Sequence, residues 1–387
     1  MTNLKKNAIF VGILLSNIFL IFFVRNALYP IHYAPQGLFF LELMGITIHI
    51  PFELLLLIET GNIVLLFLIS KKLFPNKFSL IAPMIYAVSP WSIYLVSGES
   101  FYIYLSFLIQ VYFYGLLLKS EKKFLGLVFI TIAAIIGAYT SLFLLILLPS
   151  ILCLIIFFRI YNFKYLKLSF VILSLSISPL LFLILSNQLS FKNILNKQIQ
   201  IFSDPGLLNM VNDFQGAAKQ ENLGKLAKIS ENKYLFFSEF FLLKMTKQFT
   251  PSTYFTSQEK LLNFSFSPPI YLGFLIPFFF GLYKILKSAS LQRILFLSSI
   301  IVIPSVLAKE AVDLNRLILF APVVILLISY GFTELIKQKE KKVISMFLII
   351  SISLVIFQFL TTVFDIQSRE KNRFIKYNMQ NYEIGNQ

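Results

Sequence analysis

The chain of 387 residues contains few of the residues on which several kinds of functional site depend. It has one cysteine, Cys153, and two histidines, His32 and His49. A single cysteine excludes a disulfide framework within the chain, and two histidines are too few for an imidazole-rich metal centre. The sequence also lacks a phosphate-binding glycine loop, a dinucleotide-binding fingerprint and an HExxH motif. We therefore expect no metal site built from histidine and cysteine.

Charged residues are scarce too, at 13% of the chain, whereas 57% of the residues are hydrophobic and 44 are phenylalanine. A membrane span needs about 20 mostly apolar residues. Eleven stretches qualify: 7–24, 52–70, 78–96, 101–118, 124–141, 142–158, 168–186, 265–283, 292–307, 316–336 and 343–363. The sequence thus predicts an all-α polytopic membrane protein with about 11 transmembrane helices.

Basic residues gather in every second loop between these stretches. Those loops hold 18 of the 34 basic residues and only three of the 18 acidic ones. Because loops rich in lysine and arginine stay in the cytoplasm, the pattern predicts a multi-pass protein of the cell membrane. Its N-terminus would be cytoplasmic and its C-terminus extracytoplasmic. The net charge of +16 is then explained by topology, and we expect no nucleic acid as a partner.

One assignment decides the orientation of everything that follows it. Residues 124–158 form an apolar run that is short for two spans and long for one. The segment 137–141 (GAYTS) can supply a tight turn in its middle. A single span would place Arg159, Lys164 and Lys167 outside, so the charge pattern favours two.

The expected organisation has four parts: a transmembrane module at 1–186, an extracytoplasmic helical loop at 187–264, further transmembrane helices at 265–363 and an extracytoplasmic tail at 364–387. The long loop exceeds a simple connector. Its apolar stretch 235–243 is too short to cross a bilayer. It could lie in the interface, form a lid over a site that opens outward, or pack as a structural helix.

Three local motifs in the N-terminal half occur in an informative order. They are Pro35-x-Gly37-Leu38 after the first outer loop, the junction Lys71-Lys72-Leu73-Phe74, and Ser89-Pro90-Trp91 in the third stretch. A weaker fourth signal is Asn315-Arg316, which opens a span that continues to Tyr330-Gly331. In these pieces the chain resembles membrane glycosyltransferases of the GT-C superfamily, of the protein mannosyltransferase-like and aminoarabinose transferase-like kinds. The resemblance covers residues 1–186 and, loosely, 265–335.

This resemblance implies transfer of a sugar from a polyprenyl-phosphate carrier to a lipid, glycan or protein acceptor on the extracytoplasmic face. A carboxylate would activate the acceptor hydroxyl or stabilise positive charge at the anomeric carbon. Cationic side chains would hold the carrier phosphate. The resemblance requires no cofactor and leaves a divalent cation open; the surrounding membrane lipid would be the remaining partner.

The chain departs from the family in two places. Such enzymes carry an acid in the first outer loop, but residues 25–41 contain no Asp or Glu. Where the family often has Ser-Arg-Glu in the second outer loop, this chain has Ser97-Gly98-Glu99. The missing acid in the first outer loop bears on activity. The second outer loop keeps the acid but loses the arginine.

These considerations select seven candidate residues. The catalytic candidates are Glu99, in a short outer hairpin; Glu59, an intramembrane acid; and His32, a base that titrates near neutrality. Carrier phosphate would bind Arg316 and Lys309, and the sugar would contact Trp91 and Tyr94. The alternative roles are solvation for Glu99, a hydrogen bond to Asn62 or a neighbouring helix for Glu59, and interfacial anchoring for Arg316 and the aromatic residues.

Two other function classes remain open. A lipid or glycan transporter or flippase would also be polytopic, but it should show internal repeats, and the sequence has no convincing one. A non-catalytic, diverged relative of the glycosyltransferases would keep the fold without the chemistry.

Overall fold

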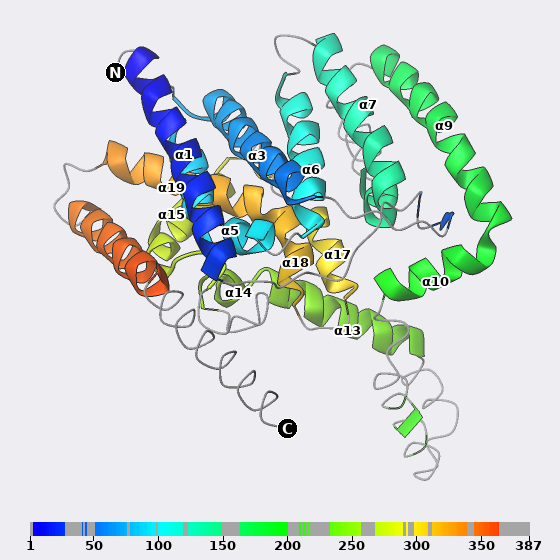
Figure 1. The fold of residues 1–387 in the computed structure, drawn as a ribbon. Coiled ribbons are helices and arrows are strands. Elements are labelled where there is room, and N and C mark those ends of the chain that lie inside the picture. The colour runs from blue at the N-terminus through cyan, green and yellow to red at the C-terminus, as the bar shows by residue number, and fades with distance from the viewer. Residues whose placement is uncertain are drawn as a thin grey trace, which may run out of the picture.

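The computed structural model describes most of the chain, and its regular elements are helices (Figure 1). The described residues are 3–27, 41, 43–44, 51–75, 78–97, 100–118, 123–148, 163–199, 209, 212–213, 216, 233–256, 268–288, 292, 298–308, 312–338 and 344–363.

Four helices in these ranges are long and apolar enough to cross a membrane by length and composition. They are α1 (Asn3–Ala27), α3 (Phe52–Leu73), the continuous segment Leu314–Lys337 and the C-terminal helix Ile344–Val363. A fifth candidate is the bent pair α9 (Phe163–Ser186) and α10 (Gln188–Gln198), which meet at 96°. The predicted all-helical membrane protein is confirmed at this coarser level.

The predicted span 78–96 is divided into two short helices, α4 (Ile81–Val88) and α5 (Pro90–Ser97). Ser89, between them, has extended backbone angles of φ −68° and ψ 132°. A residue that precedes proline avoids the helical conformation, because the proline ring would clash with its backbone. The Ser-Pro-Trp motif therefore creates the break that aims α5 in a new direction.

The apolar run 124–158 turns back on itself. Helix α7 (Lys123–Thr140) ends just before Ser141, and a further helix covers 142–148. A Cβ added at Gly137 would lie 3.2 Å from Leu144 Cβ. Seven residues of continuous helix would instead separate these positions by about 10 Å, at 1.5 Å per residue. The turn expected at 137–141 is present, although residues 149–158 of the predicted second span lie outside the described ranges.

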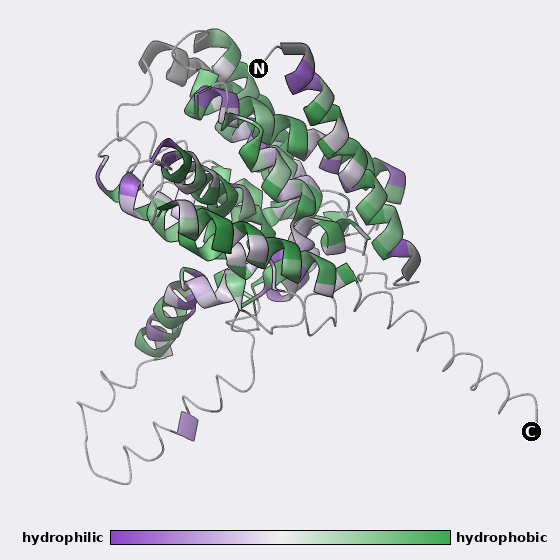
Figure 2. Cartoon of the chain, turned by 90° about the vertical axis from the view of Figure 1, so that its left-hand side faces the viewer, coloured by the Kyte–Doolittle hydropathy of each residue, from purple (hydrophilic) through white to green (hydrophobic). Residues whose placement is uncertain are grey.

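Large apolar side chains cover the outer surface of the bundle. Examples from three helices are Phe19 at 68% exposed, Phe182 at 72% and Phe357 at 65%. Figure 2 shows hydrophobic residues along the lengths of the helices, with many of the hydrophilic ones toward their ends. Such a surface would promote aggregation in water and suits a protein whose solvent is lipid.

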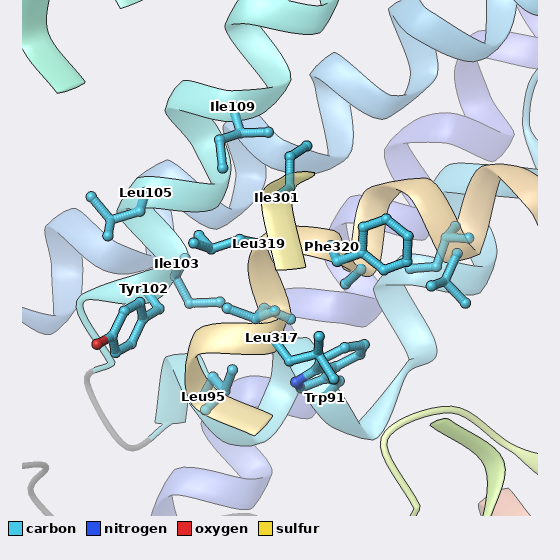
Figure 3. Packing of buried hydrophobic residues seen from close by; sticks show 14 of the residues in the cluster. Trp91, Leu95, Tyr102, Ile103, Leu105, Ile109, Ile301, Leu317, Leu319 and Phe320 are labelled. Atoms are coloured by element: carbon cyan, nitrogen blue, oxygen red, sulfur yellow. The ribbon is translucent and has the colours of Figure 1, made fainter. Parts of the chain in front are cut away.

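The core joins the two halves of the sequence. Trp91 and Leu95 of α5 and Ile103 of α6 (Tyr102–Leu117) pack with residues that lie about two hundred positions later in the chain (Figure 3). Those later residues belong to η5 (Ile300–Val302), α18 (Leu314–Leu317) and η6 (Ile318–Phe320). The N-terminal module and the late helices are therefore one packed unit.

Glycines allow the closest helix contact. α15 (Leu275–Leu286), which follows η4 (Leu272–Phe274), packs against α19 (Ala321–Lys337). A Cβ at Gly331 would come within 1.7 Å of the Pro277 carbonyl oxygen, and one at Gly281 within 2.1 Å of the Leu327 oxygen. Only glycine permits backbones to approach this closely, as small residues commonly do between membrane helices.

The elements of the predicted long loop lie at one end of the bundle. Helices α13 (Lys233–Gln248) and α14 (Pro251–Phe255) lie at the lower end of the view in Figure 1, near α5, α18 and α17 (Ile303–Val306). The starts of α1, α7 and α9 lie at the opposite end. α13 packs on α17, and Arg316, one of the two predicted cations, belongs to α18 at the same end of the bundle.

Candidate functional site

Arg316 is held by the residue that begins its own helix. Asp313 caps α18 by accepting hydrogen bonds at Oδ1 from the backbone N–H groups of Asn315 (3.0 Å) and Arg316 (3.2 Å). Its second oxygen, Oδ2, lies 3.0 Å from Arg316 Nε. Arg316 Nη1 also donates to the Pro304 carbonyl at 3.3 Å, and the guanidinium lies 5.2 Å from the centre of the Phe143 ring. The arginine is thus oriented from several sides and only 5% exposed.

A second cation reaches the same segment from α13. Lys244 is 4% exposed, and its Nζ donates to the Ala308 carbonyl at 2.6 Å. One turn later, buried Gln248 places Oε1 3.2 Å from Ser305 Oγ, which is also 3.0 Å from the Asp313 carbonyl oxygen. We call Lys244, Gln248, Ser305, Asp313 and Arg316 the Arg316 cluster. It draws on α13, α17 and α18, and its three charged members sum to one positive charge.

Tyr254 secures the end of α13 from α14. Its hydroxyl donates to the Gln248 carbonyl at 2.6 Å. Burial raises the pKa of Tyr254, because ionisation would place a charge on a group that is shielded from solvent. The hydroxyl therefore stays protonated and keeps donating across the physiological pH range, which holds Gln248 in place.

Trp91 joins α5 to the start of α18. Its indole Nε1 donates to the Leu314 carbonyl at 2.9 Å, and its backbone N–H donates to the Pro269 carbonyl at 3.2 Å. The ring is 0% exposed and lies 5.9 Å from the Tyr254 ring, while Tyr94 is 3% exposed. In this arrangement neither ring offers a face to a sugar. A sugar contact at Trp91 and Tyr94 stays a prediction that requires the site to open.

Glu59 belongs to a different polar group, inside the bundle. The side chain is 0% exposed, and Oε2 accepts hydrogen bonds from Asn62 Nδ2 and Tyr86 OH, each at 3.1 Å. Asn62 Oδ1 in turn accepts from Gln110 Nε2 at 2.8 Å. We call Glu59, Asn62, Tyr86, Ser106 and Gln110 the Glu59 cluster. The bond to Asn62 is the one that the sequence offers as the structural role for Glu59.

The seven predicted site residues fall into three groups. His32, Glu99 and Lys309 lie outside the described residues. Trp91 and Tyr94 are in the core, and the remaining two occupy separate clusters. One short helix links these clusters, because Trp91 of α5 bonds the residue that starts α18, while Ser92 Oγ donates to the carbonyl of Tyr86 at 3.0 Å.

Sequence reasoning missed Lys244 and Gln248. They lie four residues apart, and therefore on one face of α13, and both are buried. Leu235, Leu242 and Leu243 of the same helix are more than half exposed. α13 buries polar side chains and exposes apolar ones, which is the reverse of a helix on a protein surface in water. The sequence signal for this was a lysine and a glutamine on the face opposite the leucines. No group of three or more His, Cys, Asp or Glu gathers among the residues that the structure describes.

Comparison with known proteins finds a distant likeness among solved structures. No family model matches the sequence, and no curated protein matches it. Among solved structures, the chain is similar to the archaeal oligosaccharyltransferase AglB from Archaeoglobus fulgidus, in complex with an inhibitory peptide and a dolichol-phosphate. The TM-score is 0.49 and the identity 14%, over 95% of this chain and 56% of that one. The chain thus spans little more than half the length of that enzyme.

Proposed function

We propose that the protein is a membrane glycosyltransferase that takes a sugar from a polyprenyl-phosphate carrier. The observation that carries the proposal is that the motifs of the sequence resemblance pack on one another. Trp91 of Ser89-Pro90-Trp91 bonds the carbonyl just before Asn315-Arg316. Phe74, from the Lys-Lys-Leu-Phe junction, stacks on Tyr330 with ring centres 6.0 Å apart and an interplanar angle of 21°. These contacts join motifs that are distant in sequence into one packed unit, and the contact of Trp91 lies at the end that holds Arg316.

The Arg316 cluster would bind the carrier phosphate. Arg316 and Lys244 come from segments about seventy positions apart, yet both reach the stretch between Pro304 and Asp313. Lys309, predicted for the same role, directly follows Ala308, whose carbonyl accepts from Lys244. A phosphate on a lipid carrier needs charge-assisted donors that approach from more than one direction, and a planar guanidinium and an ammonium on different helices would supply them.

The remaining parts of the proposal follow from the sequence. Eleven spans with a cytoplasmic N-terminus would place the Arg316 cluster, Glu99 and the extracytoplasmic loop on the outer face. Glu99 would accept the proton of the acceptor hydroxyl, and His32 could assist as a second base. The acceptor would be a lipid, glycan or protein. A divalent cation would, if used, bind carrier phosphate rather than a cluster of protein acids.

The phosphate site can be tested by binding of undecaprenyl phosphate to the full-length protein in detergent or lipid nanodiscs. Lys244→Gln removes one charge and keeps the length of the side chain nearly constant. We expect the affinity to fall about tenfold, because a lost charge-assisted hydrogen bond amounts to about 1.4 kcal/mol or more. Arg316→Lys should weaken binding similarly, because lysine keeps the charge but loses the planar donor pair.

The matched control is Lys247→Gln. Lys247 lies on the same helix and carries the same charge, but it is exposed. Binding should change little in this variant. Equal losses in the Lys244 and Lys247 variants would show only a general attraction between charges, and unchanged binding in Lys244→Gln would remove Lys244 from the site.

Activity is tested separately in cells. Glu99→Gln should eliminate the sugar that the enzyme adds to the cell envelope, and wild-type protein should restore it. Glycan composition by mass spectrometry is the measurement. If neither Glu99→Gln nor deletion of the whole protein alters any glycan, the glycosyltransferase proposal fails, and a transporter or non-catalytic role takes its place.

A further inference from the structure

The Glu59 cluster contains more hydrogen-bond acceptors than donors. Three of its oxygen atoms are buried without a hydrogen-bond partner among the described residues: Glu59 Oε1, Gln110 Oε1 and Ser106 Oγ. Asn62 Nδ2 and Tyr86 OH already serve Glu59 Oε2, and Gln110 Nε2 serves Asn62. The Ser106 hydroxyl has one hydrogen left to donate, which can serve Glu59 Oε1 or Gln110 Oε1 but not both. A buried acceptor that receives no hydrogen bond is unfavourable, because it has lost its hydrogen bond to water and gained none in return.

The three oxygens face the same helix boundary. Asn62 of α3 bonds both Gln110 and, at 3.4 Å, the Ile103 carbonyl of α6. Ser106 lies between these two positions, one helical turn from each, and therefore on the face of α6 that meets α3. The acceptor surplus is thus confined to one place, where α3 and α6 pack together near Tyr86 of α4.

The surroundings supply no described charge to balance an ionised carboxylate. Helices α4, α5 and α6 contain no Asp, Glu, Lys, Arg or His, and Tyr86 is the tyrosine that bonds Glu59. The charged residues of α3 lie six or more positions from Glu59 and are Glu53, Lys71 and Lys72. Those of α1 lie near its ends and are Lys5, Lys6 and Arg25. Two charges on α19, Glu334 and Lys337, pair with each other in its last turn. Burying an unpaired carboxylate costs several kcal/mol even after the protein relaxes.

We propose that the Glu59 cluster is a proton-binding site inside the membrane. A proton taken from water binds Glu59 Oε1, which neutralises the carboxylate and forms a carboxyl O–H. That O–H becomes the missing donor and can serve Ser106 Oγ or Gln110 Oε1. One proton therefore removes the buried charge and reduces the acceptor surplus by two atoms, and release returns it to water.

This site is independent of the proposed sugar transfer and of the Arg316 cluster. Glu59 would keep a proton in the helix interior and would not act as a base on an acceptor at the outer face. Glu59 would carry this proton in the resting protein at neutral pH, whichever substrate the enzyme uses.

Infrared spectroscopy of the full-length protein in lipid tests the inference, because a protonated carboxyl has its own C=O stretching band. At neutral pH we expect one such band in wild type and in the control Glu53→Gln, an exposed acid on the same helix. Glu59→Gln should lose the band and keep its fold, because the amide has nearly the shape of the neutral acid. Glu59→Asp should shift the band, which gives a second test if the glutamine variant does not fold.

Three results would overturn the proposal. They are absence of the band in wild type at neutral pH, its persistence in Glu59→Gln, and its disappearance when sodium is added at constant pH. The last would show that the oxygens bind a metal cation in place of a proton. None of these results depends on glycan analysis, so the proton site and the proposed function can fail separately.

Discussion

Single buried atoms account for how this site is held together. Arg316 has its Nε on Asp313 and its Nη1 on a backbone carbonyl. Lys244 and Trp91 also donate to backbone carbonyls, of Ala308 and Leu314. The polar side chains therefore fix the backbone at Pro304, Ala308 and Leu314, and in doing so they fix one another. Losing one donor leaves a buried carbonyl unsatisfied, which costs more than the hydrogen bond contributed.

Trp91→Phe tests this at the residue scale. It keeps an aromatic ring but removes the donor to the Leu314 carbonyl. We expect destabilisation of about 1–3 kcal/mol, seen as a lower thermal unfolding midpoint in detergent. Met84→Leu, at a residue 57% exposed on α4, should leave the midpoint unchanged. If Trp91→Phe has the same unfolding midpoint as wild type, the indole hydrogen bond does not hold α5 against α18.

At the scale of elements, two features decide the packing. α13 turns its buried lysine and glutamine inward and its leucines outward, which a helix can do only where lipid or another apolar surface meets the outer face. α15 and α19 meet through Gly281 and Gly331, where even one methyl group would meet backbone. The buried face of α13 brings Lys244 and Gln248 into the Arg316 cluster. The glycine contact fixes α19, the helix that continues from α18.

Gly331→Ala should separate packing from helix propensity. Alanine is the better helix former by up to about 1 kcal/mol, so propensity alone predicts stabilisation. The Pro277 oxygen at 1.7 Å from the new Cβ predicts the opposite, and overpacking typically costs about 1–3 kcal/mol. We expect a lower unfolding midpoint for Gly331→Ala. Gly12→Ala should not lower the midpoint, because no atom lies within 4 Å of the new Cβ. Equal behaviour of both variants would contradict the close contact.

At the scale of the whole molecule, the exposed apolar surface and the alternating charges describe a protein surrounded by lipid. Exposed phenylalanines and leucines on α1, α9 and the C-terminal helix form the lipid-facing surface. The elements of the predicted outer loop lie together at one end of the bundle, away from the starts of α1, α7 and α9 (Figure 1). This segregation of the ends is what a multi-pass topology requires.

Orientation can be tested with single cysteines in a Cys153→Ala background. Ser252→Cys on α14 and Lys72→Cys at the end of α3 both lie at exposed positions. In intact cells, a membrane-impermeant maleimide should label Ser252→Cys strongly and Lys72→Cys only after lysis, because lysine-rich loops stay in the cytoplasm. The reverse pattern would invert the topology and place the Arg316 cluster on the cytoplasmic side.

The sequence predicted the helical membrane class and the turn inside 124–158, and it gave a hydrogen bond to Asn62 or a neighbouring helix as the alternative to a catalytic role for Glu59. It did not predict the division of 78–96 at Ser89, although the proline was visible, because a proline can equally well kink a continuous helix. It also did not predict Lys244 as a companion of Arg316. The pattern of α13 shows that its two faces differ but not which face turns inward.

The sequence by itself determined what can be read from composition and order: a lipid environment, and the gathering of basic residues in alternate loops. Those properties depend on transfer free energies that each residue carries wherever it lies in the fold. The tertiary structure decided which residues act together. It brought Lys244 to Ala308 and Trp91 to Leu314, and it enclosed Glu59 among neutral partners. These outcomes depend on packing between segments far apart in the chain, and no local pattern encodes such distances.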